Sequence, residues 1–210
     1  MMNKFNDRGF LFPYIRFFNA SPQGGSMDFY IGNTLVAAGI KFGHFTSYMK
    51  TGTGVQFYKA TRAGRKDDII ANISLSQNIG NVHTLCVAGK ANKAEFIAIE
   101  EPDEADKNKY AHIRVCNLSP EDTSFNVYAT GNMILGDIKF KETSRYMEIL
   151  PGSYEFSLEE NKKRVPFSES YTMKQGRFGT LYIIGLLNEQ PYIKEEFAID
   201  AASYDGFYLW

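Results

Sequence analysis

Apolar and polar residues alternate with a period of two along many short stretches of the chain. In residues 14–18 and 112–116, apolar side chains flank a single arginine, Arg16 or Arg114. This alternation is typical of a half-buried β-strand. Further strand-like runs follow at intervals of roughly 8–12 residues, are separated by turn residues such as Gly32-Asn33, and leave no helical run between them. The pattern predicts an all-β chain of the β-sandwich class.

The chain contains an internal repeat. Residues 14–49 align without a gap with residues 112–147, 98 positions further on, and 12 of the 36 aligned pairs are identical. Matching resumes near residues 84–89, now at an offset of 96. The identical pairs include Arg16/Arg114, Asn19/Asn117, Ser21/Ser119, Pro22/Pro120, Tyr30/Tyr128 and Tyr48/Tyr146. Self-similarity at one fixed spacing predicts the duplication of an ancestral unit of about a hundred residues.

The duplication predicts two domains, residues 10–100 and 109–198. Each reads as about seven or eight strands with the same order in both copies. Residues 100–109 are charged, contain a proline and lack apolar periodicity, which indicates a linker. Residues 197–210 have no counterpart before that linker, and their aromatic side chains predict that this tail docks on the body of the protein.

The openings of the two repeats, IRFFNASP and MDFYIGNTLVA in the first and IRVCNLSP and FNVYATGNMIL in the second, resemble a bacterial domain of unknown function, number 4397. The resemblance covers both repeats. It implies Ig-like or transthyretin-like antiparallel β-sandwiches in cell-surface, secreted or spore-associated proteins, with no reaction, cofactor or catalytic residue. Asn126 replaces the acid that Asp28 retains, and Asn19 and Asn117 stand where His is common, so a ligand role that depends on the family's His or on an acid in both repeats is not expected here.

Composition narrows the classes of function. With 44% hydrophobic and 22% charged residues, the chain is globular, and its net charge of −1 gives no general attraction to nucleic acid or anionic lipid. No apolar run is long enough for a signal peptide or a membrane span. We therefore expect a cytoplasmic or spore-associated protein rather than a secreted one. Cys86 and Cys116 lie in strand-like runs, which favours buried free thiols over a disulfide.

The sequence offers no recognisable catalytic, cofactor or metal site. His44, His83 and His112 lie far apart and lack ligand-spaced neighbours, and no G-x-S-x-G motif is present. Ser21 and Ser119 recur, but a serine before proline at the end of a strand is common turn chemistry.

Four polar residues are candidates for structural or ligand contacts. Arg16 and Asp28 lie on consecutive predicted strands, and Arg114 and Asn126 hold the same positions in the second repeat. We predict a partly exposed cross-strand ion pair between Arg16 and Asp28 that fixes the register. The alternative is recognition of an anion or glycan by an exposed guanidinium.

The recurring tyrosines allow two interpretations. Tyr30 and Tyr128, and likewise Tyr48 and Tyr146, either fill the core with a bonded hydroxyl or form exposed platforms for carbohydrate or peptide. The core interpretation is favoured.

The predicted function is a non-catalytic structural or protein-interaction module of a bacterial surface, spore or intracellular assembly, because what recurs is strand, turn and core chemistry. A glycan- or peptide-binding domain is the alternative, so the expected partner is a protein or a glycan. An enzyme with a site assembled from distant residues comes third.

Overall fold

The structure is a computed structural model of the 210-residue chain, and it describes residues 11–103, 106 and 109–204. The regular structure of these residues consists of strands β1 to β17 and two short 3₁₀ helices, η1 (Ala91–Lys93) and η2 (Ala201–Ser203). No α-helix occurs in the described part of the chain. The predicted all-β fold is confirmed.

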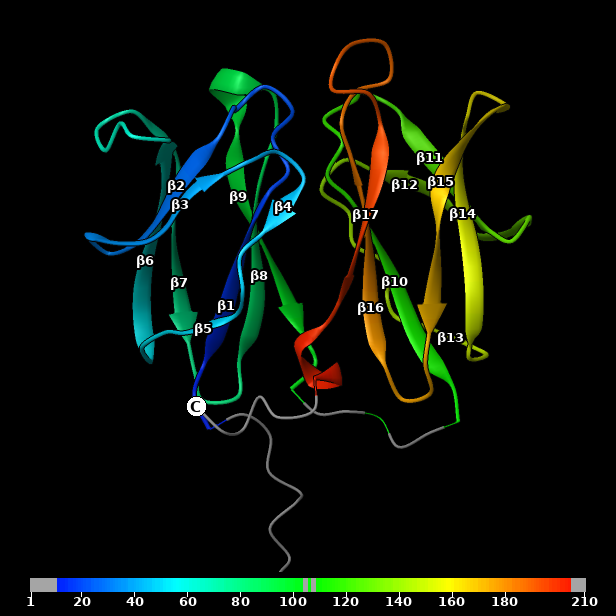
Figure 1. The fold of residues 1–210 in the computed structure, drawn as a ribbon, viewed down its shortest axis with the longest axis horizontal. Helices are drawn as coiled ribbons and strands as arrows, with labels where there is room; N and C mark the ends of the chain where they lie inside the picture. Colours follow the sequence, from blue (N-terminus) through cyan, green and yellow to red (C-terminus); the bar gives the residue numbers. More distant parts are fainter. Residues whose placement is uncertain (1–10, 104–105, 107–108, 205–210) are drawn as a thin grey trace, which may run out of the picture.

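The strands form four sheets that lie in successive layers (Figure 1). The first outer sheet has the order β3 (Thr34–Ile40), β2 (Met27–Ile31), β6 (Gly54–Arg62), β7 (Ile69–Gln77). The first inner sheet has the order β4 (His44–Phe45), β1 (Tyr14–Asn19), β8 (Val82–Ala88), β9 (Glu95–Glu101), with β5 (Met49–Lys50) also paired to β1. The second inner sheet has the order β13 (Met147–Ile149), β10 (Ala111–Asn117), β16 (Phe178–Ile184), β17 (Lys194–Ile199). The second outer sheet has the order β12 (Asn132–Lys139), β11 (Ser124–Ala129), β14 (Gly152–Glu160), β15 (Lys163–Met173).

The two repeats share one topology. Strand β1 pairs with β8 as β10 pairs with β16, and the outer sheets have matching orders. The short β4 ladder on β1 has its counterpart in a bridge between Cys116 and Thr143. The expected antiparallel sandwich needs one refinement, because the β1–β8 and β10–β16 pairs are parallel while the other ladders are antiparallel.

Three hydrophobic clusters fill the spaces between the four layers. One lies inside each sandwich, around Phe17 and Phe29 in the first and around Val115 and Phe125 in the second. The third joins the two inner sheets, where the ring centroids of Phe18 on β1 and Tyr182 on β16 lie 5.2 Å apart. The inner sheets are therefore covered on both faces, which explains why every residue of β1, β8 and β10 is buried.

The segments between and after the repeats differ from the expectation. Strand β9 continues to Glu101 and so includes the first two residues of the expected linker. Residues 197–199 belong to β17, the last strand of the second repeat, and Ala201 of η2 is buried. The first residues of the predicted tail thus belong to the counterpart of β9. The sequence alignment did not show this because the spacing between the repeats changes before this strand. Residues 205–210 lie outside the described part, and the domain limits 10–100 and 109–198 stay a prediction.

Candidate functional site

Arg16 does not form the predicted ion pair with Asp28. Its strand, β1, lies in the inner sheet, whereas Asp28 on β2 lies in the outer sheet. Along β1, Ile15 and Phe17 point into the first sandwich, so Arg16 points the other way, towards the second repeat. The side chain is buried, not partly exposed, since Arg16 keeps 3% of its accessible surface. The prediction assumed that strands adjacent in sequence are paired, and here they are not.

The guanidinium of Arg16 has four partners drawn from both repeats. Nε donates to Thr84 Oγ1 at 2.7 Å, and Nη2 pairs with Glu101 at 3.1 Å and with Asp200 at 3.3 Å. Nη1 donates to the carbonyl oxygen of Ile199 at 3.1 Å. Thr84 is placed beside the arginine by the parallel register of β1 and β8. These acceptors offset the cost of burying the guanidinium charge.

Arg114 repeats this arrangement from the other side. Its Nε donates to Thr180 Oγ1 at 2.9 Å, and its Nη1 donates to the carbonyl oxygen of Glu100, in the first repeat, at 2.7 Å. Thr180 donates in turn to Asp200. Each arginine therefore reaches across to the last strand of the other repeat. Such reciprocal contacts are the mark of a two-fold interface.

Two tyrosines complete the cluster. The Tyr48 ring lies 4.6 Å from Arg16 Cζ and its hydroxyl donates to Glu101, while the Tyr146 ring lies 4.5 Å from Arg114 Cζ and its hydroxyl donates to Asp200 at 2.6 Å. These contacts favour the structural interpretation of this recurring pair. We call the eight residues the interface network: Arg16, Tyr48, Thr84, Glu101, Arg114, Tyr146, Thr180 and Asp200.

The network carries two cations and two carboxylates, which balance. Burial, together with the neighbouring Glu101, raises the pKa of Asp200 to about 6. Burial also raises the pKa of Tyr48 and of Tyr146, and the carboxylate that each hydroxyl faces adds to the shift. Both hydroxyls therefore stay protonated as donors. Because the arginines and carboxylates are buried, a substrate in solvent does not reach them. The interface network therefore holds the two repeats together.

Asp28 and Asn126 organise local backbone. The Asp28 carboxylate accepts from the amides of Gly39 at 2.7 Å and Gly64 at 2.8 Å. In the second repeat, Asn126 Oδ1 accepts from the amide of Asp137 at 3.0 Å. Gly39 and Asp137 hold equivalent positions and both have positive φ, so the acceptor supports the irregular point of the β2–β3 and β11–β12 ladders.

Tyr30 and Tyr128 lie on the outer faces of the outer sheets. Lys59 Nζ lies 4.5 Å from the Tyr30 ring centroid, and Arg164 Cζ lies 4.0 Å from that of Tyr128. Cations at these distances make favourable contacts with the ring faces. The two rings are therefore already covered by side chains of their own sheets.

Cysteine, serine and histidine side chains have structural surroundings. Cys86 and Cys116 are buried free thiols, as predicted, and burial raises the pKa of both, that of Cys116 to about 12. Ser21 and Ser119 donate to glycine carbonyls, those of Gly89 at 2.8 Å and Gly185 at 2.7 Å, which agrees with the turn role. The three histidines are spread out: His44 is exposed, His83 is buried, and His112 stacks on Phe178. Within the described ranges, no group of three or more potential metal ligands is found.

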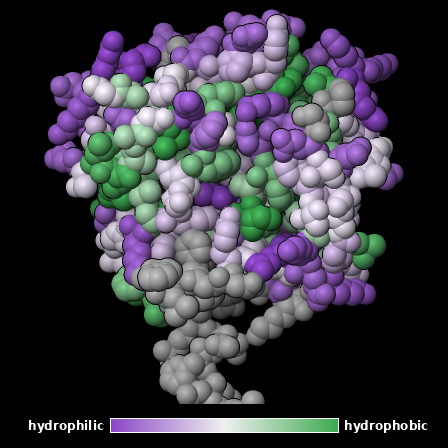
Figure 2. All heavy atoms as spheres, in the orientation of Figure 1, coloured by the Kyte–Doolittle hydropathy of each residue, from purple (hydrophilic) through white to green (hydrophobic). Residues whose placement is uncertain are grey.

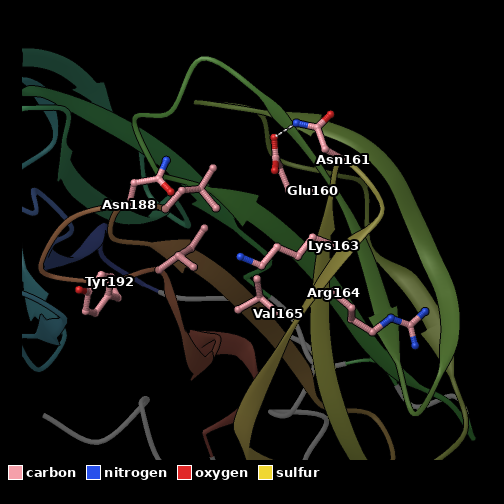
Figure 3. A pocket seen from close by; sticks show the side chains of 9 residues that line it. Glu160, Asn161, Lys163, Arg164, Val165, Asn188 and Tyr192 are labelled. Carbon is pink, nitrogen blue, oxygen red and sulfur yellow. Dashed lines mark hydrogen bonds between the residues drawn. The ribbon is translucent and has the colours of Figure 1, made fainter.

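An open groove that the sequence analysis missed lies at one end of the second sandwich (Figure 3). It has a volume of about 590 Å³ and lies between the β14–β15 hairpin and the loop that joins β16 to β17. In the sequence, the repeat match reaches Gly89/Gly185 at an offset of 96, and the strand registers place the last strands of the two repeats at an offset of 99, with Ile99 equivalent to Ala198. Three extra residues lengthen this loop in the second repeat only.

The long loop is fixed by its own backbone. Leu186 donates to the carbonyl of Pro191 at 2.9 Å, and the amide of Ile193 donates to the carbonyl of Leu186 at 2.8 Å. Gly185 begins the loop with φ of +90°, and a Cβ there would lie 2.3 Å from the backbone carbonyl oxygen of Tyr192. Only glycine allows this close approach. The Tyr192 side chain is thereby held at the groove with 59% of its surface exposed.

The fold defines a tandem β-sandwich protein with a sealed joint between the copies and an open groove in one of them. No described helix has the length and apolar character of a membrane span. The chain belongs to the family described as domain of unknown function DUF4397, whose model matches residues 13–124 and 111–194. Comparison with curated protein sequences finds no significant match.

Several solved structures are similar to the chain at low identity. A putative cell adhesion protein from Bacteroides ovatus has 10% identity and a TM-score of 0.31, over 94% of this chain and 100% of that one. A streptococcal virulence factor described as binding alpha-glucan has 9% identity and a TM-score of 0.28, over 87% and 96%. A fimbrial protein from B. ovatus has 8% identity and a TM-score of 0.21, over 84% and 49%. All three scores lie below 0.5, so the likeness carries no functional argument.

Proposed function

We propose that the chain is a non-catalytic interaction module, in which the interface network holds two sandwiches as one body and the first outer sheet binds a protein partner. The recurring arginine, threonine and tyrosine side chains support this proposal, because they are used in the joint between the repeats. Chemistry that the copies share is therefore structural. The proposed recognition surface lies where the copies differ.

The exposed face of the first outer sheet carries the proposal. Tyr58 and Ala60 of β6 point into the core, so Val55 and Phe57, at alternate positions, point to solvent with 61% and 63% of their surface exposed. Leu35 on β3 lies on the same face, because Tyr30 pairs with Leu35 on one side and with Lys59 on the other. Figure 2 shows hydrophobic residues gathered at the left of the view, on the side of this sheet.

The second outer sheet shows that the fold does not require Val55 and Phe57, whereas the equivalent of Leu35 is the exposed, apolar Met133. The equivalents of Val55 and Phe57 are Ser153 and Glu155, although the core positions beside them stay apolar. Apolar side chains that are exposed in one copy and absent from the other indicate contact with a partner. The side chains of Leu35, Val55 and Phe57 on this exposed face carry no hydrogen-bonding groups. An apolar protein surface therefore fits the face better than a sugar or an ion does.

Site-specific crosslinking tests this proposal. The photoreactive amino acid p-benzoylphenylalanine is placed at position 57 and, as the matched control, at position 155, in the cells that produce the protein. We expect a discrete protein adduct from position 57 and none from position 155. The partner identified in the adduct, once purified by itself, should bind the unmodified chain. Its affinity for the Phe57→Glu variant should be at least about tenfold lower. No adduct from position 57, or equal adducts from both positions, would contradict the proposal.

A further inference from the structure

The groove at the end of the second sandwich is a second feature that the copies do not share. Tyr192 and Asn188 lie on the longer β16–β17 loop, and Lys163 lies at the start of β15. The equivalent loop of the first repeat, residues 89–94, is three residues shorter. The groove is therefore independent of the proposed contact on the first outer sheet.

The charges that face the groove balance. Glu160 and Lys163 are register partners at the end of the β14–β15 hairpin, and both line the groove. Figure 3 shows Lys163 directed into the space between hairpin and loop, whereas the Arg164 side chain points away from it. The guanidinium of Arg164 lies over the Tyr128 ring instead. One cation and one carboxylate give no net attraction for an anion or a cation, so the groove suits a neutral ligand.

The lining offers hydrogen bonds of both kinds beside apolar surface. Asn188 presents an amide that donates and accepts, and the Lys163 ammonium presents donors only. The Asn161 amide donates to Glu160 (Figure 3). The apolar part of the lining comes from Val165, Leu187 and Ile193. The exposed Tyr192 ring adds a planar face that packs against C–H groups while its hydroxyl stays in water.

We propose that this groove binds a neutral oligosaccharide, with one sugar ring against Tyr192 and its hydroxyl groups bonded to Asn188, Lys163 and Glu160. A sugar matches the lining because adjacent hydroxyls both donate and accept, while the ring presents an apolar C–H face. The volume of about 590 Å³ lies within the usual range of ligand sites and has room for roughly two or three sugar rings. A peptide would need apolar pockets for its side chains, and a phosphate would need an excess of positive charge.

The test uses the full chain and four neutral probes: maltotetraose, cellotetraose, tetra-N-acetylchitotetraose and mannotetraose. Binding is measured by calorimetry and by NMR titration, which reports the residues affected. We expect at least one probe to bind, with shifts confined to the groove. The affinity should be insensitive to salt, because no net charge is involved.

Variants then locate the site. Tyr192→Ala should weaken binding by at least about tenfold and Asn188→Ala by less, whereas Tyr192→Phe should retain most of the affinity because the ring remains. Phe57→Ala removes an exposed aromatic side chain from the first repeat and should leave sugar binding unchanged. Thermal unfolding of each variant shows that the fold is intact.

The proposal is wrong if none of the four probes binds, if Tyr192→Ala binds as tightly as the unmodified chain, or if only charged glycans bind and lose affinity in salt. These results are separable from those of the proposed protein contact. Crosslinking from position 57 should persist in Tyr192→Ala, and sugar binding should persist in Phe57→Glu.

Discussion

Arg16 and Arg114 hold equivalent positions in the two repeats, and each donates to a backbone carbonyl near the end of the other repeat's last strand. Phe57 and Glu155 also hold equivalent positions, but one is a large exposed apolar side chain and the other is a charge. The first pair lies where the copies meet and the second where they face solvent. A duplicated fold has to keep the residues that join its copies, while its outer faces are free to acquire separate roles.

The two arginines are not equal within the joint. Arg16 forms ion pairs with both carboxylates of the network, whereas Nη2 of Arg114 is buried without a hydrogen-bond partner among the described residues. The two repeats therefore have the same residue at these equivalent positions, but the two arginines do not have equivalent partners. The network also uses Glu101 on one side and the shorter Asp200 on the other, so the two carboxylates do not reach equally far.

The largest effect is expected from removing Arg16. Arg16→Ala removes the direct ion-pair partner of Glu101 and Asp200, both of which are buried, and should lower the free energy of unfolding by about 3–5 kcal/mol. Arg114→Ala should cost less, about 2–3 kcal/mol, because its interactions are chiefly hydrogen bonds to Thr180 and a carbonyl. Urea unfolding of both variants measures the difference.

Arg62→Ala is the matched control for this comparison. Its ion pair with Asp68 is roughly half exposed, so the loss should not exceed about 1 kcal/mol. A partly exposed pair between Arg16 and Asp28, as predicted from the sequence, would imply an equally small effect for Arg16→Ala. Equal losses for Arg16→Ala and Arg62→Ala would restore that prediction and contradict the buried joint.

The fold was largely predictable from sequence, and the joint was not. Alternation along strands such as β1 and the 98-residue repeat are local signals, and they are sufficient for an all-β chain with two similar halves. The partners of Arg16 depend on sheet order, which alternation does not reveal. One signal was present: Tyr14 and Phe18 share a face with Arg16, and such nearly continuous apolar character is typical of a strand buried on both faces.

The carboxylates of the joint were hidden for a different reason. Glu101 lies in a charged stretch that resembles a linker, and Asp200 lies beyond the last matching position of the repeat. The same three-residue lengthening that displaced Asp200 in the alignment created the groove. An insertion is visible in sequence, but the shape of the loop depends on Gly185 and on backbone hydrogen bonds that only the structure defines.

A smaller effect is expected from pH, and it concerns Asp200, the carboxylate of the interface network whose pKa is raised. The pKa of Asp200 is raised to about 6, above the value near 3.9 of an unfolded aspartate. The folded state then holds the proton more tightly, so this contribution to stability is complete below about pH 4 and is lost as the pH rises through about 6. The size of the change is about 2–3 kcal/mol.

The measurement compares the unmodified chain with Asp200→Asn by urea unfolding at a series of pH values. Relative to the variant, the unmodified chain should be more stable at pH about 4 than at pH about 7. A difference between the unmodified chain and Asp200→Asn that is constant with pH, or that grows with rising pH, would contradict the shift.

The smallest effect is expected from exchanging the exposed residues of the first outer sheet for those of the second. The double variant Val55→Ser, Phe57→Glu gives the first repeat the side chains that the second repeat has at Ser153 and Glu155. Both side chains point to solvent, so removing them leaves no cavity, and the free energy of unfolding should change by no more than about 0.5 kcal/mol. Phe17→Ala, one layer inwards, is the contrasting change and should cost about 3–5 kcal/mol. Thermal and urea unfolding measure both.

If the exchange destabilised the protein as much as the core substitution, Val55 and Phe57 would be needed for folding, and their exposure would no longer favour a partner. A neutral exchange would instead confine the difference between the two repeats to what each outer face can bind.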